Sequence, residues 1–62
     1  MTHNEMLQVN RAMRKFGGSF VRALAEAWLH ADEENFAKIE ATWPEYIAKY
    51  KALVPELEQE RF

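Results

Sequence analysis

Apolar side chains recur in this chain at the spacing of an α-helix, and this periodicity limits the possible fold more than any other feature. At about 100° per residue, one face of residues 3–31 carries a continuous apolar stripe, and a second stripe runs over residues 33–54. Polar and charged residues occupy the opposite faces. We therefore predict an all-α fold, a helical hairpin of two long helices joined by a short acidic turn. The first stripe comprises Met6, Val9, Met13, Phe16, Phe20, Leu24, Ala27 and Ala31, and the second comprises Phe36, Ile39, Trp43, Ile47, Tyr50 and Val54.

The two predicted helices have recognisable starts. Thr2 and Glu5 have the spacing of a capping box, in which each residue satisfies a backbone N–H of the other. Asp32 is a suitable N-cap for the second helix, and Glu33 and Glu34 follow it in the first turn, where negative charge suits the helix dipole.

The pair Gly17-Gly18 leaves two interpretations of the first helix open. In one, Gly18 ends a helix and Ser19 caps the next. In the other, the helix continues, and the glycines allow another backbone to approach. Because Phe16 and Phe20 stay in phase across the pair, the periodicity favours the continuous helix.

Two prolines shape the second helix. Pro44 removes a backbone donor and crowds the preceding turn, so we predict a kink or a break there. Pro55 is predicted to end the helix, which leaves residues 55–62 as a frayed tail. The whole chain, residues 1–62, forms one small domain.

The short length of the chain favours association with a partner. A chain of 62 residues buries only about 60% of the surface that its unfolded form exposes, and small domains compensate with disulfides, metals or oligomers. The chain has no cysteine, which excludes disulfides and suits a reducing compartment. We therefore expect a homodimer packed as a four-helix bundle.

Charge is distributed unevenly along the chain. Residues 1–31 carry four basic and two acidic side chains, a net charge of +2, whereas residues 32–62 carry eight acidic and four basic ones, a net charge of −4. This asymmetry suits antiparallel pairing of the two halves, either within the hairpin or across a dimer. It argues against a general binder of phosphate backbones, which is normally basic overall. With no targeting segment and no apolar run of about 20 residues, we expect a cytoplasmic protein that does not enter membranes.

One stretch of the chain resembles a known group of proteins. The run FGGSFVRALAEA at residues 16–27, followed by Trp43-Pro44-Glu45-Tyr46 and then Tyr50, is similar to small helical proteins of tailed bacteriophages and prophages. The resemblance covers most of residues 10–50. It implies a viral protein that binds and inhibits or redirects one protein in the host cytoplasm, and it implies no catalytic residues.

Residues for catalysis or metal binding are scarce. The chain has a single serine, no cysteine and only two histidines, His3 and His30, so a nucleophile with its base is difficult to assemble. A metal site would require more ligands at regular spacing. We predict no enzyme activity, no cofactor and no metal.

The large side chains of the stripes suggest where a partner would bind. Trp and Tyr commonly anchor protein interfaces, and a hairpin cannot enclose every ring of this chain. The residues predicted to contact either a second copy or a target are Phe20, Leu24, Trp28, Trp43, Tyr46 and Tyr50.

We therefore predict a protein-binding module that acts by stoichiometric occlusion of a host regulatory or defence protein. The alternative is a small nucleic-acid-binding regulator that uses a basic strip of Arg11, Lys15 and Arg22 on the first helix, with Arg14 placed away from these three. A third possibility, weighed less, is a structural or assembly component of a phage particle.

Overall fold

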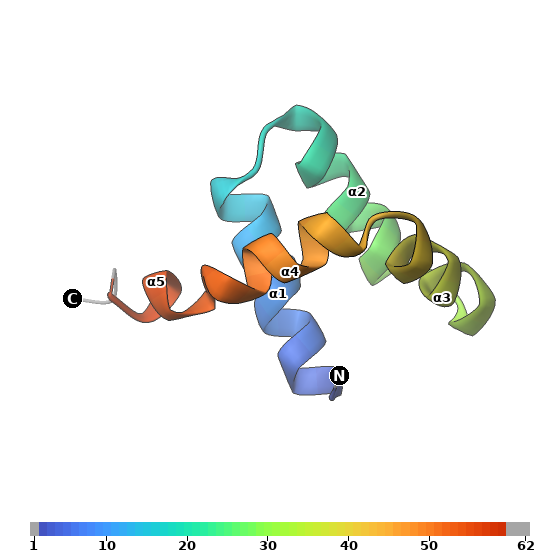
Figure 1. Ribbon diagram of the computed structural model, residues 1–62, viewed down its shortest axis with the longest axis horizontal. Helices are drawn as coiled ribbons and strands as arrows, with labels where there is room; N and C mark the ends of the chain where they lie inside the picture. Colours follow the sequence, from blue (N-terminus) through green and yellow to red (C-terminus); the bar gives the residue numbers. More distant parts are fainter. Residues whose placement is uncertain (1, 60–62) are drawn as a thin grey trace.

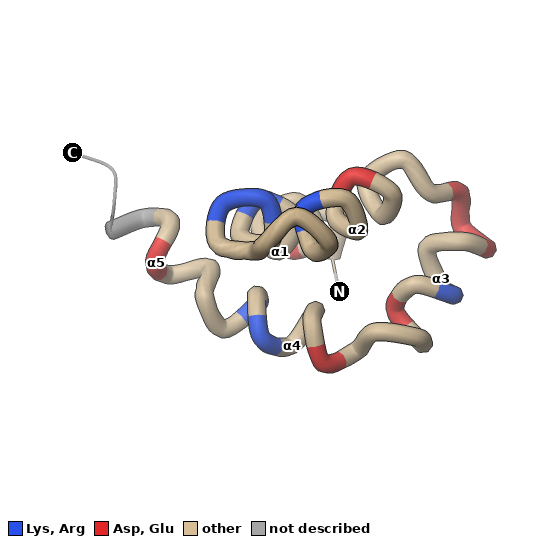
Figure 2. The backbone as a smooth tube through the Cα atoms, turned by 90° about the horizontal axis from the view of Figure 1, so that it is seen from above, with Lys and Arg blue, Asp and Glu red and all other residues tan. Residues whose placement is uncertain are grey.

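The structure, a computed structural model, describes residues 2–59, which form five helices and no strand. The helices are α1 (His3–Phe16), α2 (Ser19–Leu29), α3 (Glu33–Thr42), α4 (Pro44–Ala52) and α5 (Val54–Gln59) (Figure 1). Helices α1 and α2 form one layer, and α3 and α4 form a second layer on one side of it (Figure 2). The predicted all-α fold is confirmed, but the described chain forms five short helices where two long ones were predicted.

The prediction of a continuous helix through Gly17-Gly18 is wrong. Helix α1 ends at Phe16, and both glycines have extended backbones, with ψ of 160° and −171°. Gly18 is the N-cap of α2, so Ser19 does not cap that helix but is its first residue. The break turns the chain so that α2 packs against α1.

Gly17 is required at this break because the neighbouring atoms leave no room for a side chain. A Cβ atom there would lie 2.5 Å from the carbonyl oxygen of Met13 and 2.5 Å from Cγ1 of Val21. At Gly18, by contrast, a Cβ atom would meet nothing within 4 Å. The first glycine therefore serves close packing between the end of α1 and the start of α2.

Both predicted N-caps are confirmed. The Thr2 hydroxyl accepts a hydrogen bond from the Glu5 backbone N–H at 3.1 Å, and the Glu5 carboxylate accepts one from the Thr2 N–H at 3.0 Å. The Thr2 backbone N–H and then the Thr2 hydroxyl hold the pKa of Glu5 below its ordinary value. At the start of α3, Asp32 accepts a hydrogen bond from the Asn35 N–H at 2.8 Å.

The predicted second helix is interrupted at two places. At Trp43 the backbone leaves the helical region, with φ −127° and ψ 53°, and Pro44 begins α4, which confirms the predicted break. Pro55 does not end a helix; it lies in the first turn of α5. Residues 55–59 of the predicted tail are helical, and residues 60–62 lie outside the part of the chain that the structure describes.

The core lies between the two layers. Trp28 of α2 is fully buried, and its ring stacks on Phe36 of α3 at a centroid distance of 5.1 Å. Helix α5 contributes Leu57, which is also buried. No helix in the described range is both long and apolar enough to cross a membrane. The buried hydrophobic residues are Met6, Val9, Ala12, Met13, Val21, Leu24, Ala25, Trp28, Ile47, Tyr50 and Leu57.

Candidate interaction surfaces

The six predicted interface residues fall into two groups in the structure. Leu24, Trp28 and Tyr50 belong to the core of the single chain, with exposed fractions of 8%, 0% and 4%. Phe20 is exposed, and Trp43 and Tyr46 are half-buried. Only the second group is available to a partner without unfolding of the chain.

Phe20, Trp43 and Tyr46 form one cluster, which we call the aromatic surface. The centroid of the Phe20 ring lies 6.0 Å from that of Trp43, in an edge-to-face arrangement, and 6.0 Å from that of Tyr46. Aromatic rings attract one another at these distances. The cluster joins the first turn of α2 to the junction between α3 and α4. It is therefore held by the tertiary fold and not by one helix.

Phe20 projects from this cluster into solvent. Its side chain is 53% exposed, the largest exposure among the large hydrophobic residues that the structure describes as exposed, the others being Leu7 and Phe16 at 36% each. A large ring supported from below by two others is the kind of anchor that fills a pocket on a partner protein.

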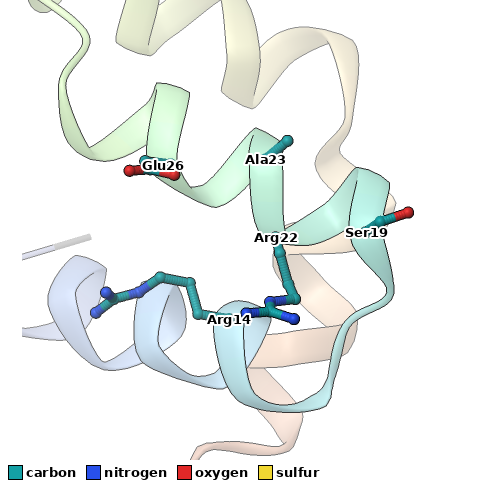
Figure 3. Close-up of a pocket in the computed structure, with 5 residues that line it drawn as sticks. All are labelled: Arg14, Ser19, Arg22, Ala23 and Glu26. Carbon is teal, nitrogen blue, oxygen red and sulfur yellow. The ribbon is translucent and has the colours of Figure 1, made fainter.

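The basic residues of α1 and α2 form a second surface, which we call the basic surface. Arg14 of α1 and Arg22 of α2 line one hollow of about 500 Å³, together with Ser19, Ala23 and Glu26 (Figure 3). In Figure 3, Arg22 reaches from α2 toward α1, and Arg14 runs along α1 on the side of Glu26. A second hollow, of about 320 Å³, is lined by Arg11, Arg14, Lys15 and Leu57.

Arg14 is therefore placed differently from the sequence prediction. It lines both hollows and so connects Arg22 with Arg11 and Lys15, from which it was expected to be separate. The reason is the break at Gly17-Gly18, which changes the direction of α2 and brings Arg22 beside the hollow that Arg14 lines. The basic surface comprises Arg11, Arg14, Lys15 and Arg22.

Two ion pairs lie away from the basic surface. Glu34 and Lys38 pair within α3 at 3.7 Å, and Glu5 of α1 and Lys51 of α4 approach to 4.0 Å. Among the side chains of residues 2–57, which the structure describes, none of the three arginines of the basic surface forms an ion pair with a carboxylate. Glu26 is the acidic residue that borders the Arg14–Arg22 hollow.

A third hollow, of about 280 Å³, separates the first half of α1 from the α4–α5 junction. Its walls are mainly apolar and include Val9, Val54 and Pro55, and the Glu5–Lys51 pair lies at its edge. Its lining residues include no cluster of titratable groups and no unpaired buried polar side chain, so the hollow offers no specific contacts to a ligand.

Asn10 is an important residue that the sequence analysis missed. Its side chain is 1% exposed, and its Nδ2 donates a hydrogen bond to the carbonyl oxygen of Ala25 at 2.6 Å, which links α1 to α2. The available signal was its position, four residues after Met6 and three before Met13, which places a polar residue on the apolar stripe.

The described residues contain no group of three or more His, Cys, Asp or Glu side chains placed to share a metal ion. Comparisons with known protein families, with curated proteins and with solved structures find no match for this chain.

Proposed function

We propose that this chain is a non-enzymatic protein-binding module that covers a functional surface of its target with the aromatic surface. The exposed ring of Phe20, supported by Trp43 and Tyr46, is the observation that carries the proposal. Because the supporting rings are already packed, little side-chain freedom is lost when a partner covers them. Binding energy at protein interfaces concentrates on such aromatic anchors.

The proposed target is a host regulatory or defence protein, and the mechanism is stoichiometric occlusion. The choice of target rests on the resemblance of residues 16–27 and of Trp43-Pro44-Glu45-Tyr46 to small phage proteins. Helices of this kind present a rigid face, so binding requires little rearrangement of the module.

The homodimer is also a proposal, and its contact surface now differs from the one predicted from the sequence. Leu24, Trp28 and Tyr50 are enclosed within one chain. A second copy would therefore contact Phe20, Trp43 and Tyr46 and would compete with the target for the same surface.

The test is affinity capture from nuclease-treated bacterial lysate with the tagged protein and two matched variants. Phe20→Ala removes the most exposed ring, whereas Leu7→Ala removes an exposed apolar side chain of α1 that lies outside the aromatic surface. We expect one stoichiometric protein to bind the wild type and Leu7→Ala and to be reduced at least tenfold with Phe20→Ala, the usual loss at an interface anchor. Equal capture by the wild type and both variants would show that the aromatic surface does not bind the target.

A further inference from the structure

We propose that the basic surface binds the phosphate groups of single-stranded nucleic acid. This proposal does not depend on protein binding by the aromatic surface, because it concerns different side chains. Its starting point is the hollow between α1 and α2, which is lined by Arg14 from one helix and Arg22 from the other (Figure 3).

The three arginines of the basic surface form no ion pair with a described carboxylate. Among the side chains that the structure describes, residues 2–57, no carboxylate pairs with Arg11, Arg14 or Arg22, although the whole chain has ten acidic residues and a net charge of −2. Arg14 and Arg22 place two positive charges beside one hollow that Glu26 also lines, so the charge of the hollow stays positive and attracts an anion. The hollow of about 500 Å³ is large enough to admit a phosphate group.

The residue types favour phosphate over a carboxylate ligand of a protein. Arginine presents a planar fork of donors that binds phosphate oxygens in pairs, and three of the four cations of the basic surface are arginines. Arg14 borders both hollows, so successive phosphates of one strand can contact Arg22 on one side of it and Arg11 on the other.

A single strand fits this surface better than a duplex. Phe16 follows Lys15 at the end of α1 and is 36% exposed, which offers a base a ring on which to stack. Stacking on aromatic rings beside a basic groove is how single strands are bound without sequence preference. The surface is too small and the whole chain too acidic for a general duplex binder.

Fluorescence anisotropy with a labelled oligothymidylate of about 10 nucleotides tests the proposal. We expect binding with a Kd of about 10⁻⁴ M or tighter at low salt. The double variant Arg14→Gln and Arg22→Gln should bind at least tenfold more weakly. Its salt dependence should also be shallower by about 1.4 in the slope of log Kobs against log salt, since each lost single-strand phosphate contact removes about 0.7.

The matched control is the double variant Lys38→Gln and Lys49→Gln, which removes the same charge from exposed positions on α3 and α4. We expect it to retain wild-type affinity within about threefold, since distant surface charges are screened. The proposal would be overturned if the wild type did not bind at a protein concentration of about 10⁻³ M. An equal loss of affinity in both double variants, or equally tight binding of a poly-glutamate peptide, would also overturn it. Circular dichroism of both variants verifies that the helices are retained.

Discussion

Asn10 shows how a single polar residue can fix the position of one helix against another. Its amide donates to the Ala25 carbonyl from a fully buried position, while its Oδ1 has no hydrogen-bond partner among the described residues. The buried Trp28 Nε1 has none either. A buried polar group that lacks a partner costs about 1–3 kcal/mol. Any other register of α1 on α2 would leave the Asn10 amide without its acceptor, so the bond to Ala25 favours a single register. Periodicity identifies Asn10 as a stripe position, but it cannot predict a partner 15 residues away.

Asn10→Asp should destabilise the fold strongly at neutral pH. A carboxylate cannot donate to the Ala25 oxygen, and a buried charge without a partner costs about 3 kcal/mol or more. Burial raises the pKa of the new carboxyl in the folded state, so the variant gains stability as the pH falls and loses it as the pH rises through that raised pKa. Urea unfolding at several pH values measures this. Asn4→Asp, on the exposed side of α1, should change the free energy of unfolding by less than about 0.5 kcal/mol. A small, pH-independent effect of Asn10→Asp would contradict the role assigned to Asn10.

Among the helices, those whose ends carry local chemical signals were predicted correctly. Thr2 and Glu5, Asp32, and Pro44 each act through a hydrogen bond or a missing donor within a few residues, and the structure has a helix end at each. The break at Gly17-Gly18 was not predicted because the apolar phase indicates which side chains are buried and not the path of the backbone between them. Phe16 and Phe20 have the sequence spacing of one helix, but Gly17 and Gly18 between them are extended and the helix direction changes there. Both rings belong to the predicted apolar stripe and are exposed in the single chain.

Alanine substitution at each glycine separates the broken helix from the continuous one. In a continuous helix, Gly17→Ala and Gly18→Ala would each stabilise the protein by about 1 kcal/mol. In this structure we expect Gly17→Ala to destabilise it by about 1–3 kcal/mol, because the new Cβ meets the Met13 carbonyl and Val21. Gly18→Ala should be nearly neutral, since nothing lies within 4 Å of its Cβ. Urea midpoints followed by circular dichroism give both values, and a gain in stability from both variants would contradict the break.

At the scale of the whole molecule, one chain encloses its own core. The accessible surface of 4421 Å² is close to the value of about 4,200 Å² expected for a folded monomer of 7.3 kDa. A helical hairpin would have left its stripes half exposed, and the sequence argument for a dimer depended on that geometry. The two additional breaks, at residues 17–18 and at Leu53, let α2 and α5 cover α1. Burial of Trp28 and Leu57 therefore needs no second copy, and any dimer forms between folded chains.

Sedimentation of the wild type and two variants tests this separation of folding from association. We expect the weight-average mass of the wild type to rise with concentration from 7.3 kDa toward twice that value. Phe20→Ala should remain monomeric with nearly unchanged stability at low concentration, because its ring is 53% exposed. Trp28→Ala should lose about 3–5 kcal/mol of stability at every concentration, since its side chain is fully buried within one chain. If Trp28→Ala instead altered only the mass and left the unfolding midpoint unchanged, the ring would belong to an interface and the single-chain core would be wrong. If the wild type stayed at 7.3 kDa up to about 1 mM, where association is worth only about 4 kcal/mol, the aromatic surface would not be a dimer contact.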